Sequence, residues 1–81
     1  MKSVFVLQHL HLHSHGEEDV KLIGVYSSRA AAIAAVTRLK GQPGFCDLPN
    51  IVSPSDEDDQ GFHIDEYVID LDYWPEGYVT V

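Results

Sequence analysis

One segment of this 81-residue chain has the composition of a helix, and this limits the fold more than any other feature of the sequence. Residues 28–40 read SRAAAIAAVTRLK, in which alanine, leucine, arginine and lysine all favour a helix. Ser27 or Ser28 can cap the first free N–H groups, and Gly41 is placed to end the helix. The hydrophobic spacing predicts a packing stripe made of Ala30, Ile33, Ala34 and Thr37, with Val36 at its edge.

The other regular patterns are those of β-strands. Residues 3–12, SVFVLQHLHL, and residues 20–27, VKLIGVYS, suit a pleated surface and together predict an antiparallel hairpin. Residues 62–72, FHIDEYVIDLD, predict a third strand, and GYVTV at residues 77–81 is a candidate short fourth strand. We therefore expect an α+β fold of the ββαβ(β) type: a small antiparallel sheet of three to four strands with one helix packed on one face.

A single helix covers only one side of such a sheet, yet the strands carry apolar residues on both sides. In the first strand, Phe5 and Leu7 alternate with Val4 and Val6. In the third strand the two sets are Phe62 with Ile64, and Tyr67 with Ile69 and Leu71. A homodimer or a protein partner is the economical explanation for what covers the second side.

The length predicts one domain spanning residues 1–81. Within it, residues 41–61 form a long irregular loop that is partly acidic, because their prolines, glycines and acidic run disfavour regular structure. Cys46 is the single cysteine and cannot form an internal disulfide. The apolar runs are too short for a signal peptide or a membrane span, so we expect a cytoplasmic protein without membrane association.

Three motifs resemble a family of short, uncharacterised bacterial proteins that is a domain of unknown function. They are VFVLQH, then IGVYSS leading into an alanine-rich helix that ends near PGF, and finally FHIDEY followed by a W-x-E-G tail. The resemblance implies an intact domain with a helix-on-sheet fold and assigns no activity. The chain departs from the family in the histidines that follow His9 and in the segment NIVSPSDEDD, which has the character of an insertion.

Charge is the strongest global signal. Five basic and thirteen acidic side chains give a formal net charge of −8. Binding to nucleic-acid phosphates needs clustered lysine and arginine, so we do not expect direct binding of DNA or RNA. An acidic surface suits a basic protein partner, including a protein that itself binds nucleic acid. The same charge is also what keeps many small domains in solution.

Histidines at alternate positions form a candidate metal site. They are His9, His11, His13 and His15. On a strand, residues two apart share a face, so the imidazoles of His9, His11 and His13 could approach one zinc ion. Further ligands could come from the third strand, where the candidates are His63, Asp65 and Glu66. The alternative is a solvated strand face, or histidines packed beneath a partner. Zinc is the cofactor this cluster would take, and no other cofactor is indicated.

Acidic and aromatic side chains form the candidate partner-binding site. Its members are Asp56, Glu57, Asp58 and Asp59 in the loop, Asp65 and Glu66 in the third strand, and Tyr73 and Trp74 near the C-terminus. A calcium loop is excluded, because Gln60 and Tyr67 stand where that motif needs ligands. A solvated acidic loop and ordinary packing of the aromatic residues remain as alternatives.

Together these patterns favour a small acidic, non-enzymatic protein-binding module, homodimeric, of the kind used by inhibitors and immunity proteins that act on a basic or nucleic-acid-binding partner. The alternative is a zinc-type metal-binding sensor or enzyme built on His9, His11 and His13. No catalytic residue is assigned, since Cys46 has no histidine near it in the sequence and no serine nucleophile motif is present.

Overall fold

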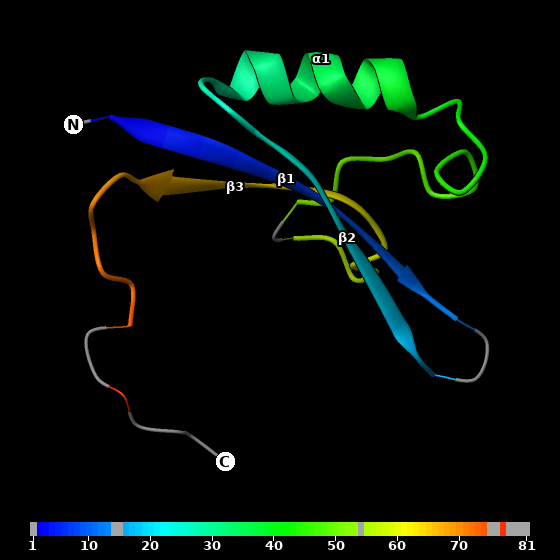
Figure 1. The fold of residues 1–81 in the computed structure, drawn as a ribbon. Coiled ribbons are helices and arrows are strands. Elements are labelled where there is room, and N and C mark those ends of the chain that lie inside the picture. Colours follow the sequence, from blue (N-terminus) through cyan, green and yellow to red (C-terminus); the bar gives the residue numbers. More distant parts are fainter. Residues whose placement is uncertain (1, 14–15, 54, 75–76, 78–81) are drawn as a thin grey trace.

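A three-stranded antiparallel sheet with one helix lying across one of its faces makes up the fold (Figure 1). The computed structural model describes residues 2–13, 16–53, 55–74 and 77. In chain order the elements are β1 (Ser3–Leu12), β2 (Glu18–Tyr26), α1 (Arg29–Leu39) and β3 (Gly61–Val68). The strands are arranged in the order β2-β1-β3. This confirms the small α+β fold expected from the sequence.

The central strand, β1, decides which side chains face the helix. Leu7 lies opposite Gly24 of β2 and Ile64 of β3, and His9 lies opposite Phe62. Side chains that stand directly opposite each other in an antiparallel sheet share a face. These residues therefore form one layer, which lies beneath α1 and the segment that follows it.

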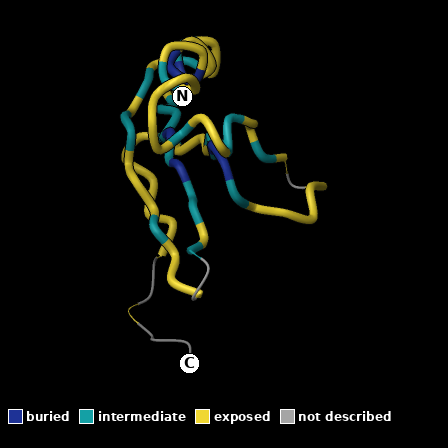
Figure 2. Tube along the Cα trace, turned by 90° about the vertical axis from the view of Figure 1, so that its right-hand side faces the viewer, coloured by how far each residue is buried: buried dark blue, intermediate teal, exposed yellow. Residues whose placement is uncertain are grey.

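The buried core is small. Its members are Leu7, Phe62, Ala35 and Val36, with Ile23, Tyr26, Leu39, Phe45 and Ile64 partly buried around them. Figure 2 shows the buried positions on α1 and on the parts of the strands closest to it, while the far end of the β1–β2 hairpin is exposed or half-buried. The helix thus covers only part of one face of the sheet.

The packing stripe expected for the helix is wrong in all but one residue. The buried residues of α1 are Ala32, Ala35 and Val36. By contrast, Ile33 is 42% exposed, and Ala30, Ala34 and Thr37 are exposed as well. Ser28 is the N-cap, and its hydroxyl accepts a hydrogen bond at 3.1 Å from the N–H three residues later. Alanines occur on every side of this helix, so the hydrophobic pattern did not define its rotation.

The segment between α1 and β3 is irregular, and in the described part of the chain it forms one backbone bridge to the sheet. Ile51 forms a parallel bridge with Phe62. There the Val52 N–H donates to the Phe62 carbonyl at 2.8 Å, and the Phe62 N–H donates to the Asn50 carbonyl at 2.9 Å. These two hydrogen bonds fix the end of the segment along the outer side of β3.

The third strand is shorter than expected. It ends at Val68, whereas the sequence pattern predicted a strand up to residue 72. Asp70 has a φ of 65°, in the left-handed region, which turns the chain out of the sheet. Of the predicted fourth strand, Gly77 is not in a strand and residues 78–81 lie outside the described residues. Within the described ranges, no helix is long and apolar enough to cross a membrane.

The tight contact at the start of β3 gives a first prediction. Gly61 has a φ of +134°, and a Cβ added there would lie 2.6 Å from the Asn50 carbonyl oxygen. Because backbone strain and a clash with main chain combine, Gly61→Ala should lower the free energy of unfolding by about 2 kcal/mol or more. Urea denaturation measures this change.

Gly41→Ala is the matched control, since an added Cβ there meets nothing within 4 Å. Its free energy of unfolding should change by less than about 0.5 kcal/mol. Equal stabilities of the two variants would contradict the close approach of the loop to β3.

Candidate functional site

The side of the sheet that faces away from α1 carries apolar side chains from all three strands. The register assigns its members: Val6 lies opposite Val25 and Asp65, and Gln8 lies opposite Leu22 and His63. We call this surface the open face. It consists of Val4, Val6, Gln8, Leu10 and Leu12 of β1, Glu18, Val20, Leu22 and Val25 of β2, and His63, Asp65 and Tyr67 of β3.

A β-bulge increases the apolar content of the open face. Leu7 is opposite Gly24 and Gln8 is opposite Leu22, so Ile23 is an extra residue in β2. Ile23 packs against the core cluster on the helix side. Because of this extra residue, Leu22 and Val25 both lie on the open face. With Val20, β2 presents three apolar residues there.

Exposure on the open face is greatest along β2. Leu22 is 64% exposed, Val25 57% and Val20 52%. On the other strands, Leu12 and Tyr67 are less exposed, at 44% and 40%. Single exposed apolar residues are ordinary on protein surfaces, whereas a contiguous patch of them on neighbouring strands is less common. The open face is such a patch.

One end of the open face is hollowed and acidic. A hollow of about 240 Å³ is lined by Leu10 and Val20 together with Gln8, Glu18, Asp59, His63 and Asp65. Its apolar floor belongs to β1 and β2, and its three carboxylates come from β2, β3 and the preceding loop. None of the residues that line it is lysine or arginine. Lys2 precedes β1, at the opposite end of the face.

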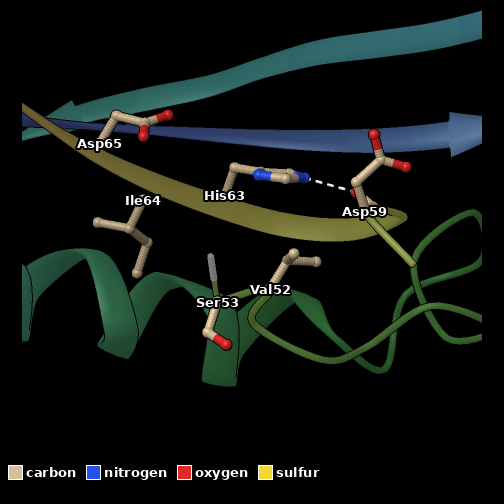
Figure 3. Close-up of a pocket in the computed structure, with 6 residues that line it drawn as sticks. All are labelled: Val52, Ser53, Asp59, His63, Ile64 and Asp65. Carbon is tan, nitrogen blue, oxygen red and sulfur yellow. Dashed lines mark hydrogen bonds between the residues drawn. The ribbon is translucent and has the colours of Figure 1, made fainter. Parts of the chain in front are cut away.

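A second hollow continues this surface across the edge of β3 (Figure 3). It has a volume of about 270 Å³, and its lining residues are Val52, Ser53, Asp59, His63, Ile64 and Asp65. In Figure 3, His63 and Asp65 project to one side of β3 and Ile64 to the other. The His63 Nε2–H donates to the Asp59 carbonyl at 2.6 Å and so holds the end of the acidic loop against the strand.

The histidines that the sequence suggested as zinc ligands lie on both faces of the sheet. His9 is fully buried on the helix side. The rings of His11 and His13 lie 4.8 Å from each other, farther along the hairpin. His63 lies on the open face. Among the residues that the structure describes, no group of three or more His, Cys, Asp or Glu side chains is placed to hold a metal ion. His15 lies outside the described residues.

His9 fills a slot between aromatic rings and the segment after α1. Its ring packs edge-on against Phe45 and Phe62, with centroid distances of 4.8 Å to each. Its Nε2 lies 3.2 Å from the Leu48 carbonyl. Since a carbonyl only accepts, Nε2 carries the proton and Nδ1 carries the lone pair. That Nδ1 atom is buried and has no hydrogen-bond partner in the described part of the chain.

The acidic residues predicted to bind a partner lie in β3 and in the loop that precedes it. Asp65 lies on the open face, whereas Glu66, the next residue, lies opposite Phe5 on the helix side. In the loop, Asp56 accepts a hydrogen bond from the Ser53 N–H at 2.7 Å, and Asp58 accepts one from the Gln60 N–H at 3.0 Å. Asp56 and Asp58 therefore shape the loop, and a further hollow of about 290 Å³ there is lined by Asp47, Asp56, Glu57 and Asp58 together with apolar and amide residues.

The two predicted aromatic residues differ in their contacts. The Tyr73 hydroxyl accepts a hydrogen bond from the Val68 N–H at 2.6 Å, and its ring packs edge-on against Tyr67. Trp74 is 79% exposed. Tyr73 thus closes one corner of the open face, while Trp74 stands beside it in solvent.

The sequence reasoning did not include β2 in the site. Val20 and Leu22 alternate with Lys21, which is the ordinary signal of one apolar strand face. The bulge then brings Val25 to the same side. The alternation could have identified the first two residues, but not the third.

Comparison with known proteins supports the family resemblance. A family model described as Domain of unknown function (DUF7336) matches residues 2–77. The chain belongs to this family. The match spans β1 to β3, including the open face and the acidic loop. No curated protein and no solved structure shows a significant match to the chain.

The buried histidine gives a second prediction. Burial lowers the pKa of His9 below its ordinary value of 6.5, and the hydrogen bond to the Leu48 carbonyl opposes this only in part. In the unfolded chain the imidazole takes up a proton near pH 6.5, whereas the folded protein resists it. Proton uptake therefore favours the unfolded state, and stability should fall as the pH falls below 6.5, by at most about 1.4 kcal/mol per pH unit from this group.

His9→Phe is the matched variant, because it keeps an aromatic ring and removes the titrating group. Urea denaturation between pH 5 and pH 8 should show that the difference in stability between the wild type and this variant depends on pH below about 6.5. A constant difference over that interval would mean that His9 is not buried as a neutral imidazole.

Proposed function

We propose that the chain is a protein-binding module whose open face takes an amphipathic, basic helix of a partner protein. The observation that carries this proposal is the open face itself: exposed apolar residues on three strands, with Glu18 and Asp59 near one end and Asp65 opposite Val6 in the middle of the sheet. The family match neither assigns nor excludes this activity.

A helix is the element that suits this surface. The opposite face of the same sheet is covered by α1, which packs through small apolar residues. Layers of helix on sheet are the common way to bury an apolar sheet face. A partner helix with an apolar stripe would complete a second such layer and would bury Val20, Leu22 and Val25, which are the most exposed apolar residues of the sheet.

Basic residues on that helix follow from the hollow at the acidic end. A lysine or arginine side chain has an apolar stem and a charged head. Its stem would lie on Leu10 and Val20, and its head would reach one of the acidic side chains that line the hollow. The net charge of −8 would also draw a basic partner towards the chain before contact.

This form of binding is compatible with the inhibitory role suggested by the composition. If the partner uses this basic helix to contact nucleic acid, the helix could not do so while it is bound to the open face. The proposal therefore includes inhibitors and immunity-type proteins as one use of the surface, and its central claim is the contact itself.

The proposed attraction between the acidic side chains and a basic helix gives a third prediction. It compares Asp65 with its neighbour Glu66, which has the same charge but lies on the other side of the sheet. The probe is a helical peptide with lysines on its polar side and leucines on its apolar side, titrated by calorimetry. Asp65→Lys places a cation on the open face and should weaken binding at least tenfold, because it removes one attraction and adds a repulsion. Glu66→Lys changes the net charge equally but on the helix side, and should change the affinity less than about twofold.

Two further results decide the proposal. The same peptide with glutamate in place of lysine should not bind, since the acidic end of the face would repel it. In an NMR titration with the lysine peptide, the amide signals that shift should belong to Val20, Leu22 and Val25 and not to α1. Equal weakening by both substitutions would show attraction to net charge alone and would overturn the proposed site.

A further inference from the structure

The sheet has two edges, and they differ in how far the chain itself occupies them. Along β3, the N–H and carbonyl of Phe62 are bonded to the loop, and the Val68 N–H is bonded to the Tyr73 hydroxyl. Backbone groups that point outwards from an edge belong to alternate residues, so these contacts leave only a short free stretch of β3. The structure closes this edge at both ends.

The outer edge of β2 is unpaired by any strand among the residues that the structure describes. No backbone hydrogen bond joins it to any described residue outside the sheet, and its nine residues contain no proline. Exposed edges of this length are sites where another strand can add. The residues with the greatest apolar exposure in the sheet, Val20, Leu22 and Val25, also belong to this strand.

The charges of β2 restrict which strand can add and in which register. Lys21 and Asp19 lie on the same side of the strand, and their side chains form an ion pair at 2.7 Å. A lysine in an edge strand opposes pairing with a strand that does not offset its charge. An antiparallel copy of β2 offsets it when the twofold axis passes between the two Val20 residues, because each Lys21 then stands opposite Asp19 of the other copy.

Neighbouring registers of the same symmetry are disfavoured. An axis at Asp19 places two aspartates opposite each other, and an axis at Lys21 places two lysines opposite each other. With the axis at Val20, the two valines face each other on the open side and contribute apolar contact. At this register the pairing is self-complementary in charge at Asp19 and Lys21, and it places Leu22 of one copy opposite Glu18 of the other.

We propose that two copies of the chain associate through the outer edge of β2, antiparallel and centred on Val20, to form one continuous sheet. The twofold axis is perpendicular to the sheet, so both open faces lie on the same side of the dimer. This association goes beyond the proposed partner binding and does not depend on it, because Asp59, Asp65 and α1 take no part in the contact.

Charge reversal tests the proposal. The wild type should sediment as a dimer at tens of micromolar in analytical ultracentrifugation. Asp19→Lys and Lys21→Asp should each raise the dimer dissociation constant at least tenfold, since each places like charges across the axis. An equimolar mixture of the two variants should restore a dimer, because the strand with two lysines then faces the strand with two aspartates. If the substitutions acted only by breaking the Asp19–Lys21 ion pair within each chain, the mixture would not restore the dimer.

A cross-link gives a second, independent measurement should either charge variant fail to fold. In a Cys46→Ser background, Val20→Cys should form a disulfide-linked dimer on mild oxidation, and Val25→Cys should form it at least tenfold more slowly. A monomeric wild type at hundreds of micromolar overturns the proposal, as does a mixture that stays monomeric or equal cross-linking of the two cysteine variants. Any of these outcomes leaves peptide binding and its dependence on Asp65 untouched, so the two proposals fail separately.

Discussion

The contact between the β1–β3 layer and the segment after α1 is the constraint on which the rest of the structure depends. A helix of eleven residues is about 16 Å long, whereas a ten-residue strand such as β1 is about 33 Å long. The helix therefore cannot cover its face of the sheet alone. Phe45 and the Leu48 carbonyl complete the cover by packing on His9 and Phe62, which makes an irregular segment part of the core.

This contact also places the acidic residues. Once the segment is held at Leu48 and again by the bridge between Ile51 and Phe62, the chain has to return to β3 along the outer side of that strand. Asp59 then lies beside His63 at the start of β3, next to the open face. The covering of one face and the acidic end of the other are consequences of the same path of the chain.

Features that depend on the local sequence pattern, such as the strands, could be predicted from the sequence. Features that depend on contacts between distant residues, such as the burial of His9, could not. Alternation correctly predicted β1 and the common side of His9 and His11, because the side-chain period of a strand is a local property. It could not show that His9 is buried, since its burial depends on Phe45 and Leu48, far along the chain. The rotation of α1 was missed for the related reason that alanines do not distinguish one side of a helix from another.

The distribution of charge on the sheet explains how a small domain can expose so much apolar surface. Glu18 and Asp59 lie near one end of the open face and Asp65 lies opposite Val6, so two copies stacked face to face would bring like charges together or would have to leave these carboxylates uncovered. At the outer edge of β2, by contrast, Asp19 and Lys21 neutralise each other. The charges therefore oppose self-association through the open face and leave the β2 edge able to pair in one register. Surface charge thus distinguishes the two proposed contact surfaces, which share a single strand.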